Sequence, residues 1–253
     1  MARPSVRSVT IPLKGLPQSF NGFKIAQISD LHVGPMIGRD YTQSVVNLTN
    51  SLNPDLIALT GDFVDGSVAQ LAEDVAPLAD LRSVHGSFYI TGNHEYYWGA
   101  EDWMAEFKRL GARVMVNEHE RISRGDDHIV LAGIPDLSTL RNQNIESADA
   151  EKSLLGVADG VVKILLAHQP NSYEMAYKAG VDLQLSGHTH AGQFFPFSPL
   201  IRFFQRYYQG LNRHDSMWIY VNSGTGYWGP PLRTGVPSEI TLITLVPDLD
   251  TAV

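Results

Sequence analysis

The chain has 253 residues, of which 43% are hydrophobic and 18% are charged, a composition typical of a folded globular protein. Its 19 basic and 27 acidic residues give a net charge of −8, which argues against nucleic-acid binding as the main function. The absence of cysteine excludes disulfides, zinc–thiolate sites and a cysteine nucleophile.

Two further features concern the organisation and location of the chain. No Pro/Gly/Ser-rich linker or charge run interrupts it, so we expect one domain over residues 1–253. No segment approaches the roughly 18 to 20 apolar residues that a membrane-spanning helix needs, and no signal-peptide core follows Met1. As given, the chain is therefore expected to be soluble, and either cytoplasmic or peripheral to a membrane.

Segments with strand-like and helix-like patterns alternate along the sequence. We predict strands at residues 6–13, 23–29, 55–60, 87–91, 113–116, 129–134, 161–167, 181–185, 218–221 and 240–245. We predict helices at residues 41–52, 68–81, 103–110 and 172–179. This alternation predicts an α/β fold, and the extra strands in the middle and at the end indicate a second sheet. Residues 137–156 are polar and irregular, and we interpret them as a flap.

Five predicted strands end in side chains that can bind a metal ion. The clearest case is the apolar run that stops at Gly92 and is followed at once by Asn93, His94 and Glu95. The other strand ends supply Asp30, His32, Asp62, His168, His188 and His190. Asp30/His32 and His188/His190 are spaced i, i+2, which in extended backbone places both side chains on one face, so each pair could bind one cation.

The candidate ligands are oxygen and imidazole without sulfur, a set that suits Mn²⁺, Fe or Zn²⁺. Seven ligands are too many for one tetrahedral ion. They fit two ions that lie about 3.5–4 Å apart and share one carboxylate. Enzymes that act on phosphoryl groups use this geometry. Two such cations polarise a phosphate and lower the pKa of a bound water. The remaining histidines have no such context, and we expect structural or surface roles for His85, His119, His128 and His214.

The ordered motifs resemble those of the calcineurin-like metallophosphoesterase superfamily. They are Asp30-x-His32, Gly61-Asp62, Gly92-Asn93-His94-Glu95, Ala167-His168 and Gly187-His188-Thr189-His190. The resemblance implies one metal held by Asp30, His32, Asp62 and His190, and a second held by Asp62, Asn93, His168 and His188. It also implies that His94 protonates the leaving oxygen. The implied fold is a four-layer α/β/β/α sandwich, with two mixed sheets flanked by helices.

Two positions extend the resemblance and one departs from it. By resemblance, Asp65 orients the imidazole of His94, and Glu95 is expected to orient neighbouring backbone without ligating a metal. The protein Ser/Thr phosphatase branch has a phosphate-clamping arginine directly after the position of Asp65, whereas this chain has Gly66. We therefore take Arg233 as the candidate substrate-binding residue in its place, with a surface arginine as the alternative.

The downstream sequence resembles a membrane-associated subgroup of the superfamily. Its motifs are Gly187 to Phe197, Gly224-Thr-Gly226 and Pro231-Leu-Arg233. That subgroup includes transmembrane proteins with a metallophosphoesterase domain and UDP-2,3-diacylglucosamine pyrophosphatases of lipid A biosynthesis. Residues 194–208 combine aromatic and basic side chains, a pattern that favours peripheral membrane contact or binding of acyl chains. A core patch or a dimer interface are the alternatives for this segment.

These observations predict a binuclear metal-dependent phosphohydrolase. The expected substrate is a phosphorylated small molecule or lipid-linked nucleotide, such as UDP-2,3-diacylglucosamine, cleaved at a phosphodiester or pyrophosphate bond. The alternatives are a phosphomonoesterase and a catalytically inactive scaffold. A zinc peptidase is disfavoured, because Trp98 stands where a His-Glu-x-x-His motif needs its second histidine.

Overall fold

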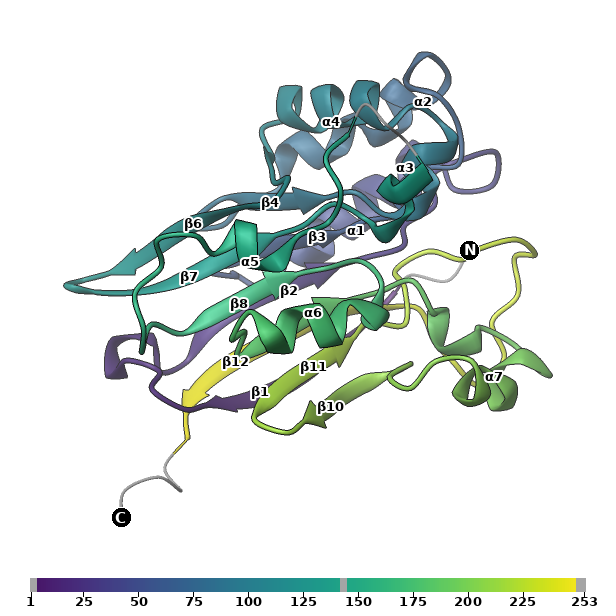
Figure 1. Ribbon diagram of the computed structural model, residues 1–253. Helices are drawn as coiled ribbons and strands as arrows, with labels where there is room; N and C mark the ends of the chain where they lie inside the picture. Colours follow the sequence, from purple (N-terminus) through teal and green to yellow (C-terminus); the bar gives the residue numbers. More distant parts are fainter. Residues whose placement is uncertain (1–3, 142–144, 249–253) are drawn as a thin grey trace.

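The computed structural model describes residues 4–141 and 145–248. Two six-stranded sheets pack face to face, and helices cover their outer faces (Figure 1). The strand orders are β1-β12-β2-β3-β4-β5 and β10-β11-β9-β8-β7-β6. The prediction of a four-layer α/β/β/α sandwich with two mixed sheets is therefore confirmed.

The first sheet is built mainly from the amino-terminal half of the chain. Its strands are β1 (Ser5–Leu13), β2 (Phe23–Ile28), β3 (Leu56–Thr60), β4 (Ser87–Ile90), β5 (Arg113–Val114) and β12 (Glu239–Pro247). The helices on this side are α1 (Arg39–Ser51), α2 (Val68–Val75), α3 (Asn93–Tyr97) and α4 (Ala100–Arg109). The last strand, β12, inserts between β1 and β2, parallel to the first and antiparallel to the second. β2 to β5 are parallel, so their carboxyl ends lie at one edge.

The second sheet is built from the remainder of the chain. Its strands are β6 (Glu118–Arg124), β7 (Asp127–Gly133), β8 (Lys163–Leu166), β9 (Leu183–Ser186), β10 (Gly210–His214) and β11 (Met217–Val221). Its helices are α5 (Ala150–Ser153), α6 (Tyr173–Lys178) and α7 (Phe197–Leu200). β7, β8, β9 and β11 are parallel, and hairpins add β6 and β10 at the two edges. Helices α3 and α7 lie at the same end of the sandwich, on the right in Figure 1.

Three apolar layers hold the sandwich together. The middle layer lies between the sheets and includes Phe20, Phe23, Ile164, Leu185 and Tyr220. The second layer packs α1, α2 and α4 on the first sheet, and the third packs α5 and α6 on the second sheet. Because strands buried on both faces must be apolar throughout, β3 reads Leu-Ile-Ala-Leu-Thr without alternation.

The structure differs from the sequence predictions at several places, and the short helices α3 and α7 were not predicted. Helix α2 ends at Val75 and continues as a 3-10 turn to Asp80, because Pro77 interrupts the helical hydrogen bonding predicted over residues 68–81. The strands β6 and β10 were not predicted, since both are polar edge strands. The flap interpretation is wrong for residues 150–154, where α5 buries Ala150 and Leu154 against the second sheet. Residues 142–144 of that segment lie outside the described residues.

The helices within residues 4–141 and 145–248 are not long and apolar enough to cross a bilayer.

Candidate metal centre

The candidate ligands lie where strands of both sheets end. Asp30 follows β2, Asp62 follows β3, and Asn93 begins α3 after β4. His168 and His188 follow β8 and β9 in the second sheet. Five ligand residues have left-handed backbone, with φ between 48° and 72°: Asp30, His32, Asp62, His188 and His190. This conformation is uncommon for residues other than glycine and is typically tolerated at functional sites. The extended backbone expected for the two i, i+2 pairs is therefore wrong, and His188 and His190 belong to different ligand clusters.

Two glycines allow these turns to pack closely. A Cβ on Gly92 would lie 2.2 Å from Oδ1 of Asp62. A Cβ on Gly187 would lie 2.0 Å from Oγ of Ser29 and 2.2 Å from Oδ2 of Asp30. Larger residues would therefore displace the aspartates, which gives a physical reason for the glycines seen in the motifs.

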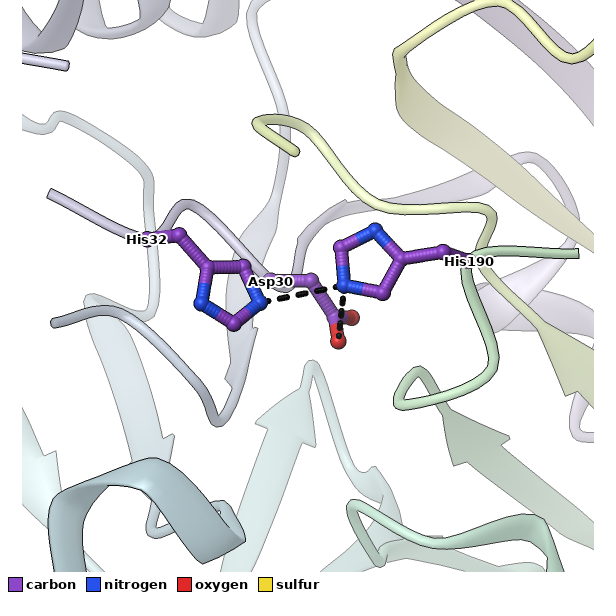
Figure 2. Close-up of side chains that lie close together, drawn as sticks. All are labelled: Asp30, His32 and His190. Atoms are coloured by element: carbon purple, nitrogen blue, oxygen red, sulfur yellow. Dashed lines mark hydrogen bonds and ion pairs between the residues drawn. The ribbon is translucent and has the colours of Figure 1, made fainter. Parts of the chain in front are cut away.

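The first ligand cluster joins Asp30, His32 and His190 (Figure 2). The Nε2 atoms of His32 and His190 are 3.0 Å apart, and Nε2 of His190 lies 3.3 Å from Oδ1 of Asp30. The two imidazoles face one another with these nitrogens directed to the carboxylate (Figure 2). The backbone N–H of His188 donates to the same carboxylate at 2.9 Å and fixes its orientation. Three ligand atoms thus converge within reach of a single cation.

The second cluster joins Asp62, His168 and His188, with Asn93 beside it. Nδ1 of His168 lies 2.7 Å from the carbonyl oxygen of Thr60. A carbonyl oxygen can only accept a hydrogen bond, so Nδ1 carries the proton. In the neutral imidazole, Nε2 then has a free lone pair. That Nε2 is 3.1 Å from Oδ2 of Asp62.

Three buried atoms in this cluster have no hydrogen-bond partner: Oδ1 of Asn93, Nε2 of His168 and Nδ1 of His188. Buried polar atoms without partners are rare in folded proteins because each costs free energy. An amide oxygen and two imidazole nitrogens are ordinary metal ligands, so a bound cation would satisfy all three. The residues of this cluster therefore fit a metal ion.

The electrostatics of the centre also favour cations. Burial opposes ionisation of Asp30, but the neighbouring His190 outweighs it and lowers the pKa of Asp30 to about 2. Asp62 is likewise buried, and His168 lowers its pKa well below the usual value. Burial lowers the pKa of His190 to about 4. Buried carboxylates need compensating charge, and in the described part of the chain their ion-pair partners are histidines.

His94 is held beside the clusters by Asp65. Its Nδ1 lies 2.5 Å from Oδ1 of Asp65. The same Oδ1 lies 3.2 Å from Nδ1 of His32. Burial favours the neutral ring, but the hydrogen bond to Asp65 and the charge of Asp62 raise the pKa of His94. Burial likewise opposes ionisation of Asp65, and the hydrogen bonds to the two histidines lower its pKa. Asp65 therefore contacts both the candidate ligand His32 and the candidate proton donor His94.

Glu95 is fully buried and does not join either cluster. Its carboxylate accepts from the backbone N–H groups of Asp62, Phe63 and Gly92, at 3.1, 2.7 and 2.6 Å. It thereby ties the turn after β3 to the turn after β4. The expectation that Glu95 orients backbone is confirmed.

Arg233 does not line the cavity beside the metal ligands, which argues against the direct substrate contact expected of it. Its guanidinium donates to the carbonyl oxygens of Gly226 and Ser223 at 2.9 Å each. Its Nη2 also lies 3.0 Å from Nδ1 of His190. This arginine is half-buried beside a candidate ligand, and its guanidinium is held by these contacts. Burial lowers the pKa of Arg233 to about 10.

The clusters open into a cavity of about 400 Å³. Its floor includes His32, Asp62, Asn93, His94, His188 and His190. Its walls are largely apolar and aromatic, and include Tyr97, Phe194, Phe197, Ile201 and Trp228. The aromatic segment 194–208 therefore forms part of the cavity wall, and its exposed residues, Phe203 and Phe204 among them, project from α7 and the turn after it.

The sequence of residues 23–192 matches the family model of the calcineurin-like phosphoesterases. This chain belongs to that family. It is 39% identical over 251 residues to the transmembrane protein with metallophosphoesterase domain of Danio rerio, covering 96% of this chain and 57% of that protein. It is also 39% identical to an uncharacterized metallophosphoesterase of Helicobacter pylori, covering 98% of this chain and 65% of that protein. This phosphoesterase-family chain thus spans less than two thirds of the length of either relative.

Solved structures share the fold of this family member at low sequence identity. The calcineurin-like phosphoesterase YfkN from Bacillus subtilis aligns with a TM-score of 0.53 and 15% identity, over 88% of this chain and 91% of that one. A dimetal phosphatase from Danio rerio aligns with a TM-score of 0.51 and 12% identity, over 83% and 90% of the two chains. Both likenesses concern the fold, and the recognition of the superfamily from its motifs is confirmed by the family match.

Sequence reasoning missed three polar or aromatic residues of this calcineurin-like site. Gln193, Gln205 and Trp228 line the cavity, yet none belongs to a metal-ligand motif. The signal for Gln193 was present, since it is the one amide in the run from Gly187 to Phe197. Trp228 comes from the loop before β12, and nothing in its local sequence indicates that it approaches the metal ligands.

Proposed function

We propose that this chain is a binuclear metal-dependent phosphoesterase that hydrolyses a phosphodiester or pyrophosphate bond. The observation that supports it is that members of two ligand clusters line one cavity together with His94, which Asp65 holds by a hydrogen bond. This arrangement supplies places for cations, a proton donor and a substrate-sized space within a few ångströms.

In this proposal, Asp30, His32, Asp62 and His190 would hold the first cation. Asp62, Asn93, His168 and His188 would hold the second, so both sets include Asp62. Oxygen and imidazole donors suit Mn²⁺, Fe or Zn²⁺. Once bound, the cations would supply charge stabilisation for the phosphoryl group and lower the pKa of a water molecule for attack.

The protein residue with a direct chemical role is His94. Asp65 accepts a hydrogen bond from Nδ1–H of His94, which leaves Nε2 directed away from that carboxylate. In the protonated ring, Nε2–H is the group that can donate to the departing oxygen. The raised pKa of His94 favours the protonated form that this step needs.

The character of the cavity favours a substrate with little charge beyond its phosphoryl group. Within the described part of the chain, no lysine or arginine lines the cavity, and its walls are aromatic or aliphatic. A phosphomonoester or polyphosphate carries extra negative charge that such walls do not compensate. A phosphodiester carries a single negative charge and is better matched. A lipid-linked nucleotide such as UDP-2,3-diacylglucosamine has a pyrophosphate with two negative charges, and it is the acyl chains that suit the apolar walls.

The proposal includes peripheral membrane contact through residues 194–208. Phe203 is 71% exposed and Phe204 is 79% exposed, and the guanidinium of Arg202 lies 5.1 Å from the ring of Phe203. Exposed aromatic rings beside arginines are suited to an anionic lipid interface. In sedimentation with anionic liposomes, Phe203→Ser/Phe204→Ser should reduce binding. The control Val84→Ser, which removes a 77% exposed apolar residue before β4, should not. No binding by the unaltered chain would contradict membrane contact.

The decisive experiment compares three substrates with the metal-reconstituted chain: p-nitrophenyl phosphate, bis-p-nitrophenyl phosphate and UDP-2,3-diacylglucosamine. His94→Ala accompanies each as the control. Preference for the last two over the monoester supports the proposal, and preference for the monoester indicates a phosphomonoesterase. No hydrolysis of any, with both metals bound, indicates an inactive scaffold.

A further inference from the structure

Two separate loops form the mouth of the cavity above the metal ligands. The first follows the 3-10 turn His190–Gly192 and contributes Phe194 and Phe197. The second connects β11 to β12 and contributes Trp228, whose side chain is 54% exposed. The distance between these two apolar walls decides how large a substituent can enter beside the phosphoryl group.

Gln193 joins the two loops. Its Nε2 donates to the carbonyl oxygens of Trp228 at 2.7 Å and Pro230 at 3.3 Å, and its Oε1 accepts from the N–H of Trp228 at 2.8 Å. Its own carbonyl accepts from the N–H of Thr234 at 3.1 Å. Gln193 is 3% exposed and has left-handed backbone at φ 52°. Among the described residues, the hydrogen bonds that link 228–232 to the first loop all pass through this amide.

The chemistry of these contacts requires an amide. One end of the side chain must donate to carbonyl oxygens while the other accepts an N–H, and Gln does both at this length. Glutamate has the same size but cannot donate when ionised, and methionine has a similar shape with neither group. The site therefore distinguishes Gln193 from residues of equal volume, which points to a role beyond packing.

We propose that Gln193 is a positioning residue that sets the spacing of the Phe194/Phe197 wall and the Trp228 wall, and thereby selects phosphoesters with a bulky apolar substituent. The selection of substrates in this inference rests on the proposed phosphoesterase function. The hydrogen bonds that join the two loops do not depend on that function. Gln193 acts through Trp228, so a change at Gln193 should matter less once the indole is gone.

The test compares KM for bis-p-nitrophenyl phosphate and methyl p-nitrophenyl phosphate, which share a leaving group and differ in the second substituent. Gln193→Met should raise the ratio of KM for bis-p-nitrophenyl phosphate to KM for methyl p-nitrophenyl phosphate by about tenfold. This is the effect expected from losing the hydrogen bonds of one buried amide. Gln193→Glu, whose carboxylate would face the carbonyl oxygens of Trp228 and Pro230, should raise the ratio by at least as much. Gln43→Met, the same change on α1, should leave the ratio as it is.

A double variant separates positioning from general disruption. In a Trp228→Ala background, Gln193→Met should change the ratio by less than about twofold, because the wall it positions is absent. An unchanged ratio in Gln193→Met, or an effect of full size in the Trp228→Ala background, would overturn the inference.

A second readout does not depend on activity. Limited chymotrypsin digestion of the metal-loaded chain should cut after Phe203, Phe204 or Trp228 about tenfold faster in Gln193→Met than in the unaltered chain. Equal cleavage rates would refute the tie between the loops. Faster cleavage combined with no hydrolysis of either ester by the unaltered chain would retain the tie and refute the proposed function instead.

Discussion

Replacing Asp65 by asparagine removes one negative charge from beside His94. It keeps an oxygen that can accept a hydrogen bond from Nδ1–H. Oδ1 of Asp65 lies 2.5 Å from Nδ1 of His94, and this contact raises the pKa of the ring. The variant should therefore lower the pKa of His94. Since the proposed proton donor must be protonated, activity should then be lost at a lower pH than in the unaltered enzyme.

The free energy involved follows from the contact. A hydrogen bond to a charged group is worth about 1.5–3 kcal/mol, and asparagine would keep the hydrogen bond but lose its charge. The side chain of Asp65 is 27% exposed, so solvent screening favours the lower end. We expect the basic limb of the pH profile to move to lower pH.

The assay is kcat/KM against pH for a phosphodiester with an alkyl leaving group, which must be protonated as it departs. Metal content is measured for each preparation because Asp65 also contacts His32. Asp40→Asn, at an exposed position in the first turn of α1, is the matched control and should leave the profile in place. An equal loss of activity at all pH values, without movement of the basic limb, would refute the assigned role of Asp65.

Three further predictions concern the ligands and turns. His94→Ala should lower kcat by about 10²–10⁴-fold for diesters with alkyl leaving groups. The loss should be smaller for p-nitrophenyl esters, because their leaving group needs no proton. Bound metal should be retained in this variant. His168→Ala should reduce the metal-to-protein ratio by elemental analysis and shrink the rise in Tm on metal addition; an unchanged ratio would exclude this histidine as a ligand. Gly187→Ala should lower both metal content and the free energy of unfolding, by about 1–3 kcal/mol in urea titration, because its Cβ would overlap Ser29 and Asp30. A variant of native stability and full metal content would show that the turn can move aside.

The candidate metal ligands could be singled out from the sequence because their signal is local. Each ligand follows an apolar run and a tight turn, and these features are set by neighbouring residues. The parallel strands β2 to β4, and β8 and β9, then end at one edge, so residues as distant as His32 and His190 meet with nitrogens 3.0 Å apart. The roles of these residues as ligands stay predictions until metal is measured.

The edge strands β6 and β10 were not predictable, because a polar edge strand has neither an apolar run nor strict alternation. Periodicity also could not place β12 between β1 and β2, since strand order depends on contacts between the two ends of the chain. The flap interpretation of 137–156 failed for a similar reason. Few apolar residues in that segment suffice for packing once a sheet face lies beneath them.

The sequence by itself determined the α/β class, the order of the strand-end motifs and the chemical type of the ligands, because these depend on short-range patterns. The tertiary structure alone decided which side chains share partners. Arg233 lies behind His190 and Gln193 joins the two loops of the cavity mouth, because β12 and the loop before it fold back onto the metal-ligand turns. Such contacts depend on how the two sheets pack, a property of the whole chain that no local stretch of sequence contains.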